Sequence, residues 1–359
     1  MSTHRTARIT LFKLIFLVFA VAPFAAQAQT TPSQSFTTSE GDLFEVSLEL
    51  DKDTIMLSEP MYMSFHFKSF SSRDLCVGIG GDYRNKLGRP NSFKVSVVRE
   101  DAKAVPQPDA GPGFGGFSGC GIIPAGKTYD IRLYLPHWAT FEDAGSYEIT
   151  VERNLRVGAY TAESVPTSFK ARLSRTLNVV ANDSEQTSAL INSLGAVMLE
   201  KDNQKNREAA SMLGYYVKDK RTLPHFAAAM EKFGAEPEWS DEQIIVAKAA
   251  WALSTFDDDR AIDALEKVMT SQVDDTRLAV AEAFAASKHA RAYNLLLSMK
   301  NDTYSLVRVR IAERLSQVNS KDSIALLREM LADENEDVRK AARVSLDKLR
   351  KNDANGMNP

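Results

Sequence analysis

The C-terminal half of the chain repeats its pattern of apolar residues every 31 residues. The segment EDVRKAARVSL (Glu336–Leu346) aligns with SLVRVRIAERL (Ser305–Leu315) after one shift and with DDTRLAVAEAF (Asp274–Phe284) after two. Within each segment apolar residues recur at helical spacing, which indicates helices with one buried face. A helical pair cannot cover its own apolar face, so successive pairs have to stack. The repeat therefore predicts an α-solenoid in this half of the chain.

A second helix repeats with the same period. Apolar residues over Ile324–Met330 match those over Tyr293–Met299. A further copy begins at Asn206, 39 rather than 31 residues before its successor, and the segment FGAEPEWS (Phe233–Ser240) accounts for the excess. We therefore expect about five helical pairs within residues 184–350.

The repeated segments resemble the HEAT-repeat family, and specifically the short HEAT-like repeats named after phycobilisome lyases. The resemblance covers about residues 184–350 and rests on the three segments quoted above. It implies stacked helical pairs and, because such arrays bind far more often than they catalyse, a surface for another protein. The lyase name is not carried over, because nothing in the sequence matches a chromophore site.

Arginine recurs at one position of the repeat. The copies are Arg277, Arg308 and Arg339. One interpretation is a basic ladder on the inner face that receives carboxylates from a partner. The other is a structural role, in which the arginines pack against aspartates of adjacent turns such as Asp302, Asp333 and Asp337. We favour the structural role. Val246 stands where a further arginine would be and interrupts any continuous row.

Other charged residues of the second helices are better candidates for exposed positions that contact a partner. They are Lys248, Glu282, Glu313, Arg343 and Asp347. Their mixed signs favour a protein partner over a polyanion such as nucleic acid.

The N-terminal half has a different composition. Gly, Pro and alternating apolar residues dominate before residue 182, and Ala, Leu, Glu, Lys and Arg dominate after it. The segment MYMSFHFKS (Met61–Ser69) alternates with a period of two, as in a half-buried strand. Similar segments are Phe44–Leu50, Phe93–Arg99, Tyr129–Leu135, Tyr147–Val151 and Thr176–Val180. Many short strands separated by turn residues predict an immunoglobulin-like antiparallel β-sandwich over residues 36–182.

One local feature supports this class of sandwich. The segment DAGSY (Asp143–Tyr147) resembles the tyrosine corner of immunoglobulin-like domains, in which the phenol bonds to backbone a few residues upstream. Ile149 stands where antibody-type domains have a cysteine, so the resemblance does not extend to that group. It implies a generic immunoglobulin-like sandwich and nothing about partners.

The two cysteines, Cys76 and Cys120, both lie in this half. An even number of cysteines in an exported chain predicts one disulfide. The alternative is a pair of buried free thiols. A metal site is disfavoured, because no second ligand stands at CxxC or HxxxH spacing from either residue.

The two ends are expected to lie outside the folded regions. Residues 1–28 combine a basic start, the apolar run Leu14–Ala22 and a small-residue cleavage motif, which is typical of a signal peptide cut after Ala28. Residues 351–359 are expected to form a disordered tail. We expect a periplasmic or secreted protein, with a bacterial envelope favoured, and no membrane insertion after cleavage.

Removal of residues 1–28 also changes the charge. It takes away Arg5, Arg8 and Lys13 but no acid, so the formal charge moves from −3 to −6. A mildly acidic chain is a poor match for nucleic acid or anionic lipid.

No catalytic or cofactor motif is present in the sequence. HExxH is absent, and in GFSGCG the residue Cys120 stands where GxSxG requires a second glycine. We expect a non-enzymatic scaffold without metal or cofactor that binds another protein through the array. The alternative is a secreted inhibitor or carbohydrate-binding module that uses the loop over residues 106–121, with Phe114 and Phe117 as contacts. An enzyme would need a site at the domain junction, near His137 or His225.

Overall fold

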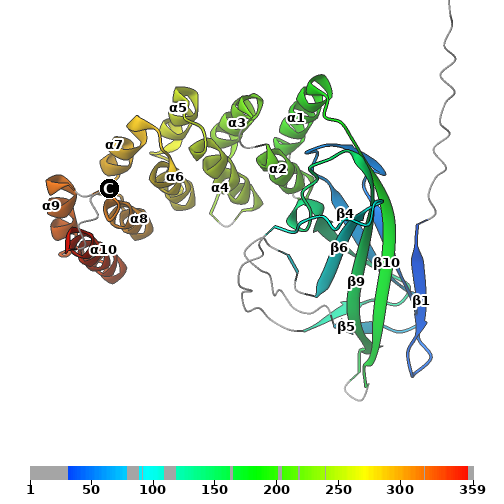
Figure 1. Ribbon diagram of the computed structural model, residues 1–359. Coiled ribbons are helices and arrows are strands. Elements are labelled where there is room, and N and C mark those ends of the chain that lie inside the picture. The colour runs from blue at the N-terminus through cyan, green and yellow to red at the C-terminus, as the bar shows by residue number, and fades with distance from the viewer. Residues whose placement is uncertain are drawn as a thin grey trace, which may run out of the picture.

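A computed structural model places the two halves side by side as a β region and a helical array (Figure 1). The described residues are 31–78, 89–90, 92–108, 119–161, 165–200, 204–216, 219–238, 240–318 and 320–354. The predicted signal peptide lies outside them, and so do Phe114 and Phe117 of the loop that carries the alternative function.

The described residues of the N-terminal region form ten strands. They are β1 (Ser33–Thr37), β2 (Leu43–Leu50), β3 (Thr54–Met56), β4 (Tyr62–Ser69), β5 (Leu75–Gly78), β6 (Phe93–Arg99), β7 (Cys120–Ile123), β8 (Thr128–Tyr134), β9 (Gly145–Ala159) and β10 (Thr167–Val180). One sheet has the order β1-β2-β4-β8, and the other has the order β3-β10-β9-β5-β7 with β6 also paired to β9. All pairs are antiparallel except β3 with β10.

The two sheets enclose one apolar core. Phe65 and Phe67 of β4 face Val151 of β9 and Leu173 of β10 within a single buried cluster. Alternate residues of each strand supply this core, which is why the period of two in the sequence identified β2, β4, β6 and β8. The two facing sheets agree with the predicted sandwich, and its assignment to the immunoglobulin-like class stays a prediction.

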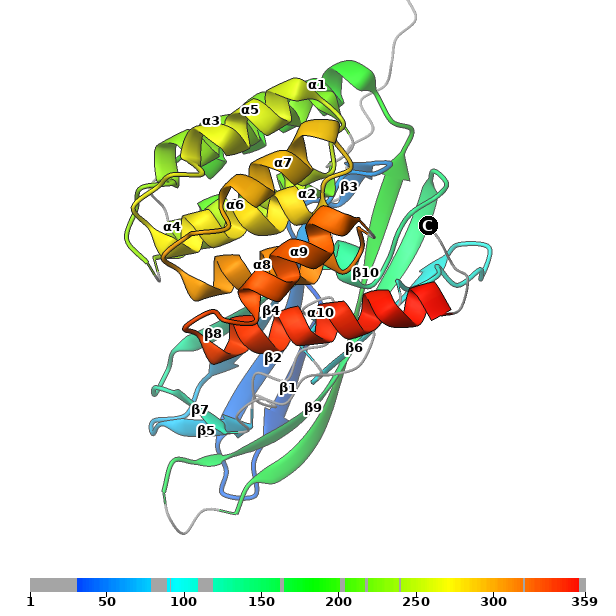
Figure 2. The same ribbon diagram turned by 90° about the vertical axis from the view of Figure 1, so that its left-hand side faces the viewer.

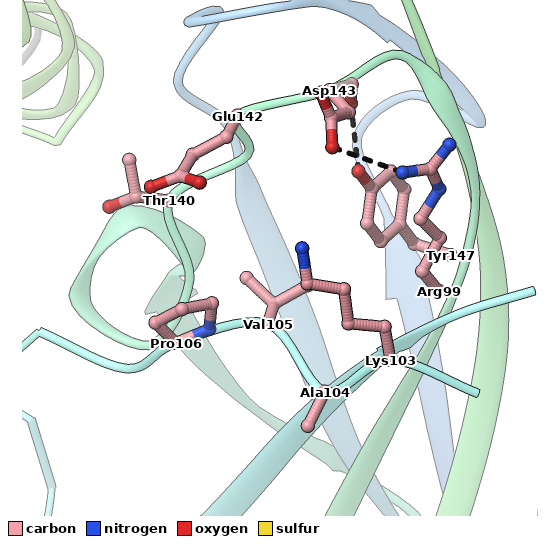
Figure 3. Close-up of a pocket in the computed structure, with 9 residues that line it drawn as sticks. All are labelled: Arg99, Lys103, Ala104, Val105, Pro106, Thr140, Glu142, Asp143 and Tyr147. Atoms are coloured by element: carbon pink, nitrogen blue, oxygen red, sulfur yellow. Dashed lines mark hydrogen bonds and ion pairs between the residues drawn. The ribbon is translucent and has the colours of Figure 1, made fainter. Parts of the chain in front are cut away.

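The hydrogen bond of a tyrosine corner is present at the start of β9. The phenol of Tyr147 donates to the Asp143 carbonyl oxygen at 2.7 Å, and Arg99 Nη1 donates to Asp143 Oδ2 at 3.0 Å (Figure 3). The hollow beside this corner, lined by Lys103 and Glu142 among others, has a volume of about 30 Å³. That space holds one or two water molecules, so this corner is structural rather than a ligand site.

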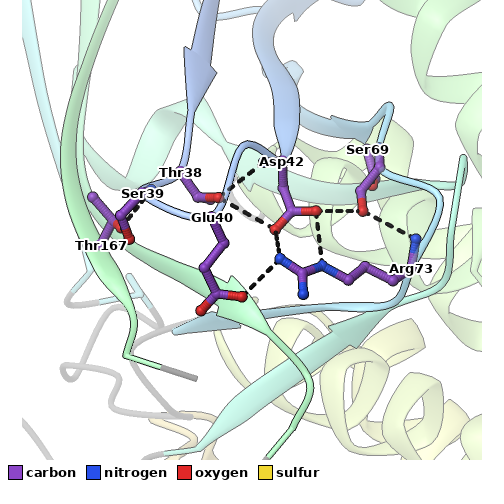
Figure 4. A network of polar contacts seen from close by, with 8 residues as sticks. Thr38, Ser39, Glu40, Asp42, Ser69, Arg73 and Thr167 are labelled. Carbon is purple, nitrogen blue, oxygen red and sulfur yellow. Dashed lines mark hydrogen bonds and ion pairs between the residues drawn. The ribbon is translucent and has the colours of Figure 1, made fainter. Parts of the chain in front are cut away.

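A polar network fixes the turn between β1 and β2. Asp42 receives two hydrogen bonds from Arg73, Nε to Oδ1 at 3.0 Å and Nη2 to Oδ2 at 2.7 Å, and a third from Ser71 Oγ at 2.8 Å (Figure 4). These donors lower the pKa of Asp42, with the hydrogen bond from Arg73 the largest cause. Ser39 Oγ lies 3.0 Å from Thr167 Oγ1 and links the turn to β10.

The predicted disulfide joins Cys76 in β5 to Cys120 in β7, with their Cα atoms 5.3 Å apart. These strands pair directly, with Cys76 opposite Ile122 and Gly78 opposite Cys120. The bond therefore covalently joins two adjacent strands at one edge of the larger sheet and closes the intervening loop.

In the part of the array that the structure describes, ten helices follow the sandwich as five pairs, as the repeat predicted. They are α1 (Ser184–Met198), α2 (Lys205–Tyr215), α3 (Leu223–Phe233), α4 (Asp241–Ser254), α5 (Asp259–Val268), α6 (Asp274–Ala286), α7 (Ala290–Ser298), α8 (Ser305–Leu315), α9 (Lys321–Met330) and α10 (Glu336–Ala354). Side chains of Asp183, Ser240, Asp258 and Ser320 cap the N-termini of α1, α4, α5 and α9. Helix α10 continues to Ala354, so the first part of the predicted tail is helical.

The helices stack in two rows. The odd-numbered helices form an outer row and the even-numbered helices form an inner row on the concave side of the arch (Figures 1 and 2). One continuous apolar cluster runs from Ile191 in α1 to Leu349 in α10. This arrangement confirms the α-solenoid. Among the described residues, no helix is both long and apolar enough to cross a membrane.

Candidate interaction surface on the inner row

The repeated arginines are structural rather than exposed. Arg308 Nε and Nη2 each donate to a carboxylate oxygen of Asp333 at 2.8 Å, and Nη1 donates to the Asp302 carbonyl oxygen at 2.7 Å. Arg277 bonds to the Asp302 carboxylate in the same way, at 2.9 and 3.0 Å. In both pairs each arginine reaches the loop before the next inner helix. The arginines therefore tie neighbouring repeats together.

The last arginine of the series differs. Arg339 Nη1 donates to the backbone carbonyl oxygens of Asp333 and Glu334, each at 2.8 Å. Asp337, which we expected among the structural partners, is instead exposed on the surface of α10.

Four of the five charged residues proposed as contacts are exposed, namely Glu282, Glu313, Arg343 and Asp347. The fifth, Lys248, is not. Its Nζ donates to Ser211 Oγ of α2 at 3.1 Å, and burial lowers the pKa of the lysine. Helix α2 covers this side chain, so Lys248 is not freely exposed to a partner.

Apolar side chains that the sequence analysis did not select share this surface. Ile244 and Leu306 occupy one repeat position and are 44% and 37% exposed; Trp251 and Val344 occupy another and are 56% and 61% exposed. Large apolar side chains exposed in register along an array indicate a binding surface. The signal was available in the alignment, because Trp251 and Val344 align with Glu282 and Glu313.

These two positions define a surface that we call the inner stripe. Along α4, α6, α8 and α10 the first position holds Ile244, Asp275, Leu306 and Asp337, and the second holds Trp251, Glu282, Glu313 and Val344. Every member is thus a large apolar residue or a carboxylate. Two of these carboxylates share a cation: Arg310 of α8 donates to Glu282 at 2.9 Å and to Glu313 at 2.8 Å.

The last residues of the inner stripe line a groove between α8 and α10. Its volume is about 570 Å³, within the range of pockets that hold ligands or side-chain clusters. Leu306 and Val344 provide apolar surface, and Glu313, Lys340 and Lys348 provide charged surface. An apolar groove with charges around it suits a partner side chain flanked by polar contacts.

The other end of the inner row is anchored to the sandwich. Arg132 of β8 donates from Nε and Nη2 to both carboxylate oxygens of Glu208 in α2, at 3.0 and 2.9 Å, and from Nη1 to Asp51 at 2.6 Å. The Tyr134 phenol donates to the Ser211 carbonyl oxygen at 3.3 Å. The bidentate contact of Arg132 and the hydrogen bond of Tyr134, both from β8, fix where the array begins.

This contact also changes the surface of β4. Tyr62 and Ser64 were expected on the polar face of that strand, yet both are buried. The Arg132 guanidinium lies 5.0 Å from the ring centre of Tyr62 and donates to Ser64 Oγ at 2.8 Å. Burial raises the pKa of Tyr62 to about 12. The outer face of this part of the sheet is therefore an interdomain surface.

The two histidines considered for a junction enzyme lie in separate surroundings. His225 Nε2 lies 3.1 Å from Asn192 Oδ1 of α1, and burial lowers its pKa. The ring of His137 packs edge-on against Tyr134 at 4.9 Å, and its carbonyl oxygen accepts a hydrogen bond from Arg89. Among the described residues, no group of three His, Cys, Asp or Glu side chains could hold a metal ion.

Comparison with protein families identifies the repeats. The family model described as HEAT repeats matches residues 271–347, and the model described as PBS lyase HEAT-like repeat matches residues 245–271. Residues 245–347 are therefore HEAT-like repeats, as their resemblance implied. No curated protein matches the chain.

Several solved structures are similar to part of this chain. An engineered protein is 18% identical, with 47% of this chain and 92% of that chain covered and a TM-score of 0.28. The complex of CpcE and CpcF of phycocyanin lyase from a Nostoc species is 22% identical, with 44% and 64% covered and a TM-score of 0.30. Human deoxyhypusine hydroxylase in complex with glycerol is 12% identical, with 47% and 98% covered and a TM-score of 0.27. At these scores the likenesses carry no functional argument.

Proposed function

We propose that this chain is an exported, non-enzymatic scaffold that binds another protein along the inner stripe of its HEAT-like array. The observation that carries the proposal is the exposure of Trp251 and Val344 at equivalent repeat positions, three repeats apart. Burial of a large apolar side chain contributes about 1.5–3 kcal/mol, so two such anchors and their neighbours supply substantial binding free energy. Charged residues between the anchors would set specificity.

Export is supported by the disulfide. Disulfides persist in oxidising compartments and are rare in the cytosol. The sequence before the sandwich has the basic start and apolar run of a signal peptide. Intact-mass measurement of the chain purified from its own host tests this part: a chain that begins at Gln29 supports export, and a full-length cytosolic chain contradicts it.

Site-specific photo-crosslinking tests the binding surface. A benzophenone amino acid replaces Ala247, an exposed residue of α4 between Ile244 and Trp251, or, as the matched control, Arg328 on the exposed side of α9 in the outer row. We expect adducts of one defined mass from position 247 in the host and none from position 328. Adducts from position 328 alone, or from a sandwich position such as Ile122 alone, would place the binding surface elsewhere.

A further inference from the structure

The chemistry of the inner stripe specifies the kind of partner, and this inference rests on the proposed function. Both stripe positions of α4 are apolar, Ile244 and Trp251, and both of α6 are acidic, Asp275 and Glu282. The apolar side chains therefore lie beside carboxylates rather than in a separate patch. A partner that covers both has to alternate apolar anchors with cations.

The spacing of the stripe distinguishes a helix from an extended segment. Its two positions on one helix are seven residues apart, which at 1.5 Å per residue is about 10.5 Å. Packed helices lie about 8–10 Å apart, so the positions of neighbouring inner helices are separated by a similar distance. The stripe is thus a nearly square grid with sides of about 10 Å.

A partner helix that crosses the inner row matches this grid. Seven of its residues also rise about 10.5 Å and return to nearly the same face, so one side chain meets each inner helix. An extended strand covers about 10 Å in three residues. Three is an odd number, so successive contacts would come from opposite faces of the strand.

The charge on the inner row changes along its length. Asp275 and Glu282 make α6 the acidic part, whereas the exposed surface of α10 has mixed charges, with Lys340, Arg343 and Lys348 beside Asp337 and Asp347. Arg310 already offsets part of the charge of Glu282 and Glu313. A partner therefore needs its cationic residues mainly opposite α6. It needs its apolar residues opposite α4 and opposite the groove between α8 and α10.

We propose that the inner stripe binds an amphipathic helix of a partner protein, with apolar anchors at seven-residue intervals and cationic residues where it crosses α6. Such a helix would bury Trp251 and Val344 and pair its lysines or arginines with Asp275 and Glu282.

Two synthetic helices provide the probes. Both carry leucines at seven-residue intervals over about four heptads; one has lysines, the other glutamates, at the positions that meet α6. Binding to the full chain is measured by fluorescence anisotropy of the labelled peptides at about 0.15 M salt, where distant charges are screened. We expect the lysine peptide to bind at least tenfold more tightly than the glutamate peptide.

Variants of the chain locate the contact. Glu282→Lys should reduce the affinity for the lysine peptide about tenfold and raise that for the glutamate peptide, since both effects follow from one paired charge. Trp251→Ala should weaken both peptides about tenfold or more, as loss of an apolar anchor does. Glu329→Lys in α9 makes the same change of charge on the outer row and should alter neither. Circular dichroism melting curves confirm that each variant is folded.

The outcomes separate the two proposals. Equal affinities of the peptides, or an unchanged preference in Glu282→Lys, would overturn the cationic-helix proposal. Crosslinks from position 247 together with such a result would leave the binding surface in place with a partner of other chemistry. No crosslinks from position 247 would overturn the proposed function itself, and a lysine peptide that binds regardless of Glu282 would then reflect charge attraction alone.

Discussion

Arg308 in the array and Arg153 in the sandwich are both buried, yet they are accommodated differently. Arg308 forms a bidentate ion pair with Asp333, which raises the pKa of the arginine. Nε and Nη2 of Arg153 have no hydrogen-bond partner among the described residues, and its guanidinium lies 4.6 Å from the ring centre of Phe93 and 5.5 Å from that of Phe65. Burial lowers the pKa of Arg153 to about 10.

The difference shows how each region is stabilised. In the array, each carboxylate lies 25 residues after its arginine in the sequence, so the same contact forms in successive repeats. In the sandwich, neighbours of a core residue come from strands that are distant in the sequence, and each contact is made once. Local repetition therefore stabilises the array, whereas long-range pairing and one covalent link stabilise the sandwich.

The largest expected effect removes the covalent link. The double substitution Cys76→Ala and Cys120→Ala opens a loop with a sequence separation of 44 residues. In the chain-entropy model this costs the sandwich about 4 kcal/mol. Hydrogen exchange followed by mass spectrometry should show faster exchange in β5, β7 and β9 and unchanged exchange in α6–α9. Equally faster hydrogen exchange in the sandwich and in the array would show that the two regions unfold as one unit.

A somewhat smaller effect is expected within the array. Arg308→Ala leaves the Asp333 carboxylate, whose side chain is only 13% exposed, without its bidentate partner. Breaking a buried pair in this way costs about 3 kcal/mol. Urea unfolding followed by helical circular dichroism measures the loss. Arg339→Ala is the control, because that side chain contacts backbone carbonyls rather than a carboxylate. A loss of stability in this control as large as that of Arg308→Ala would contradict the structural role of the ion pair.

The same ion pair predicts acid sensitivity. The hydrogen bond from Arg308 lowers the pKa of Asp333 below its usual range. Because the unfolded state binds the proton more tightly, this contribution is fully present above the unfolded pKa and is lost as pH falls through the lower folded pKa. Urea midpoints of the wild type should therefore fall below about pH 4 more steeply than those of Arg308→Ala. If the urea midpoints of the two proteins fall equally steeply with pH, the ion pair does not lower the pKa of Asp333.

An intermediate effect tests the first pair of the array. Gly195 of α1 packs directly against His225 of α3, and a Cβ at this glycine would overlap the imidazole ring. Gly195→Ala should destabilise the array by about 1–3 kcal/mol, the usual cost of overpacking. His225→Ala removes the overlap, so the double variant should recover most of the loss in a urea titration. If the losses of the two single variants add in the double variant, Gly195 is required for its backbone conformation rather than for its contact with His225.

The smallest effect is expected at the arginine in the sandwich. Arg153→Met keeps an unbranched side chain beside Phe65 and Phe93 and removes a buried charge that meets no carboxylate among the described residues. Stability should change by less than about 1 kcal/mol, in either direction. Thermal unfolding measures it. A loss of about 3 kcal/mol, as for Arg308, would remove the contrast between the two regions.

The array could be predicted from particular residues. Val338 and Arg339 of the last repeat recur as Val307 and Arg308 one period earlier, so both the buried face and the structural arginine were visible without coordinates. The charged contact candidates were less secure. Lys248 looked exposed by its type and position, but its side chain lies against the neighbouring inner helix, where Nζ donates to Ser211 Oγ of α2.

The sandwich was predicted less completely. Strands β2, β4, β6 and β8 alternate clearly, whereas β1, β3, β5 and β7 were not identified because they are short or lie at sheet edges. The burial of Tyr62 could not be predicted either, since its cover comes from α2, far away in the sequence.

The sequence by itself therefore determined the two fold classes, the number of helical pairs and the pairing of arginine with aspartate, because each depends on local periodicity or on a fixed offset along the chain. The even number of cysteines predicted the disulfide. The tertiary structure decided what periodicity cannot express: which outer surfaces are covered, where β8 meets α2, and that Ile244, Trp251, Leu306 and Val344 are exposed together. Exposure depends on what every other part of the chain leaves uncovered, so it follows only from the packing of the whole molecule.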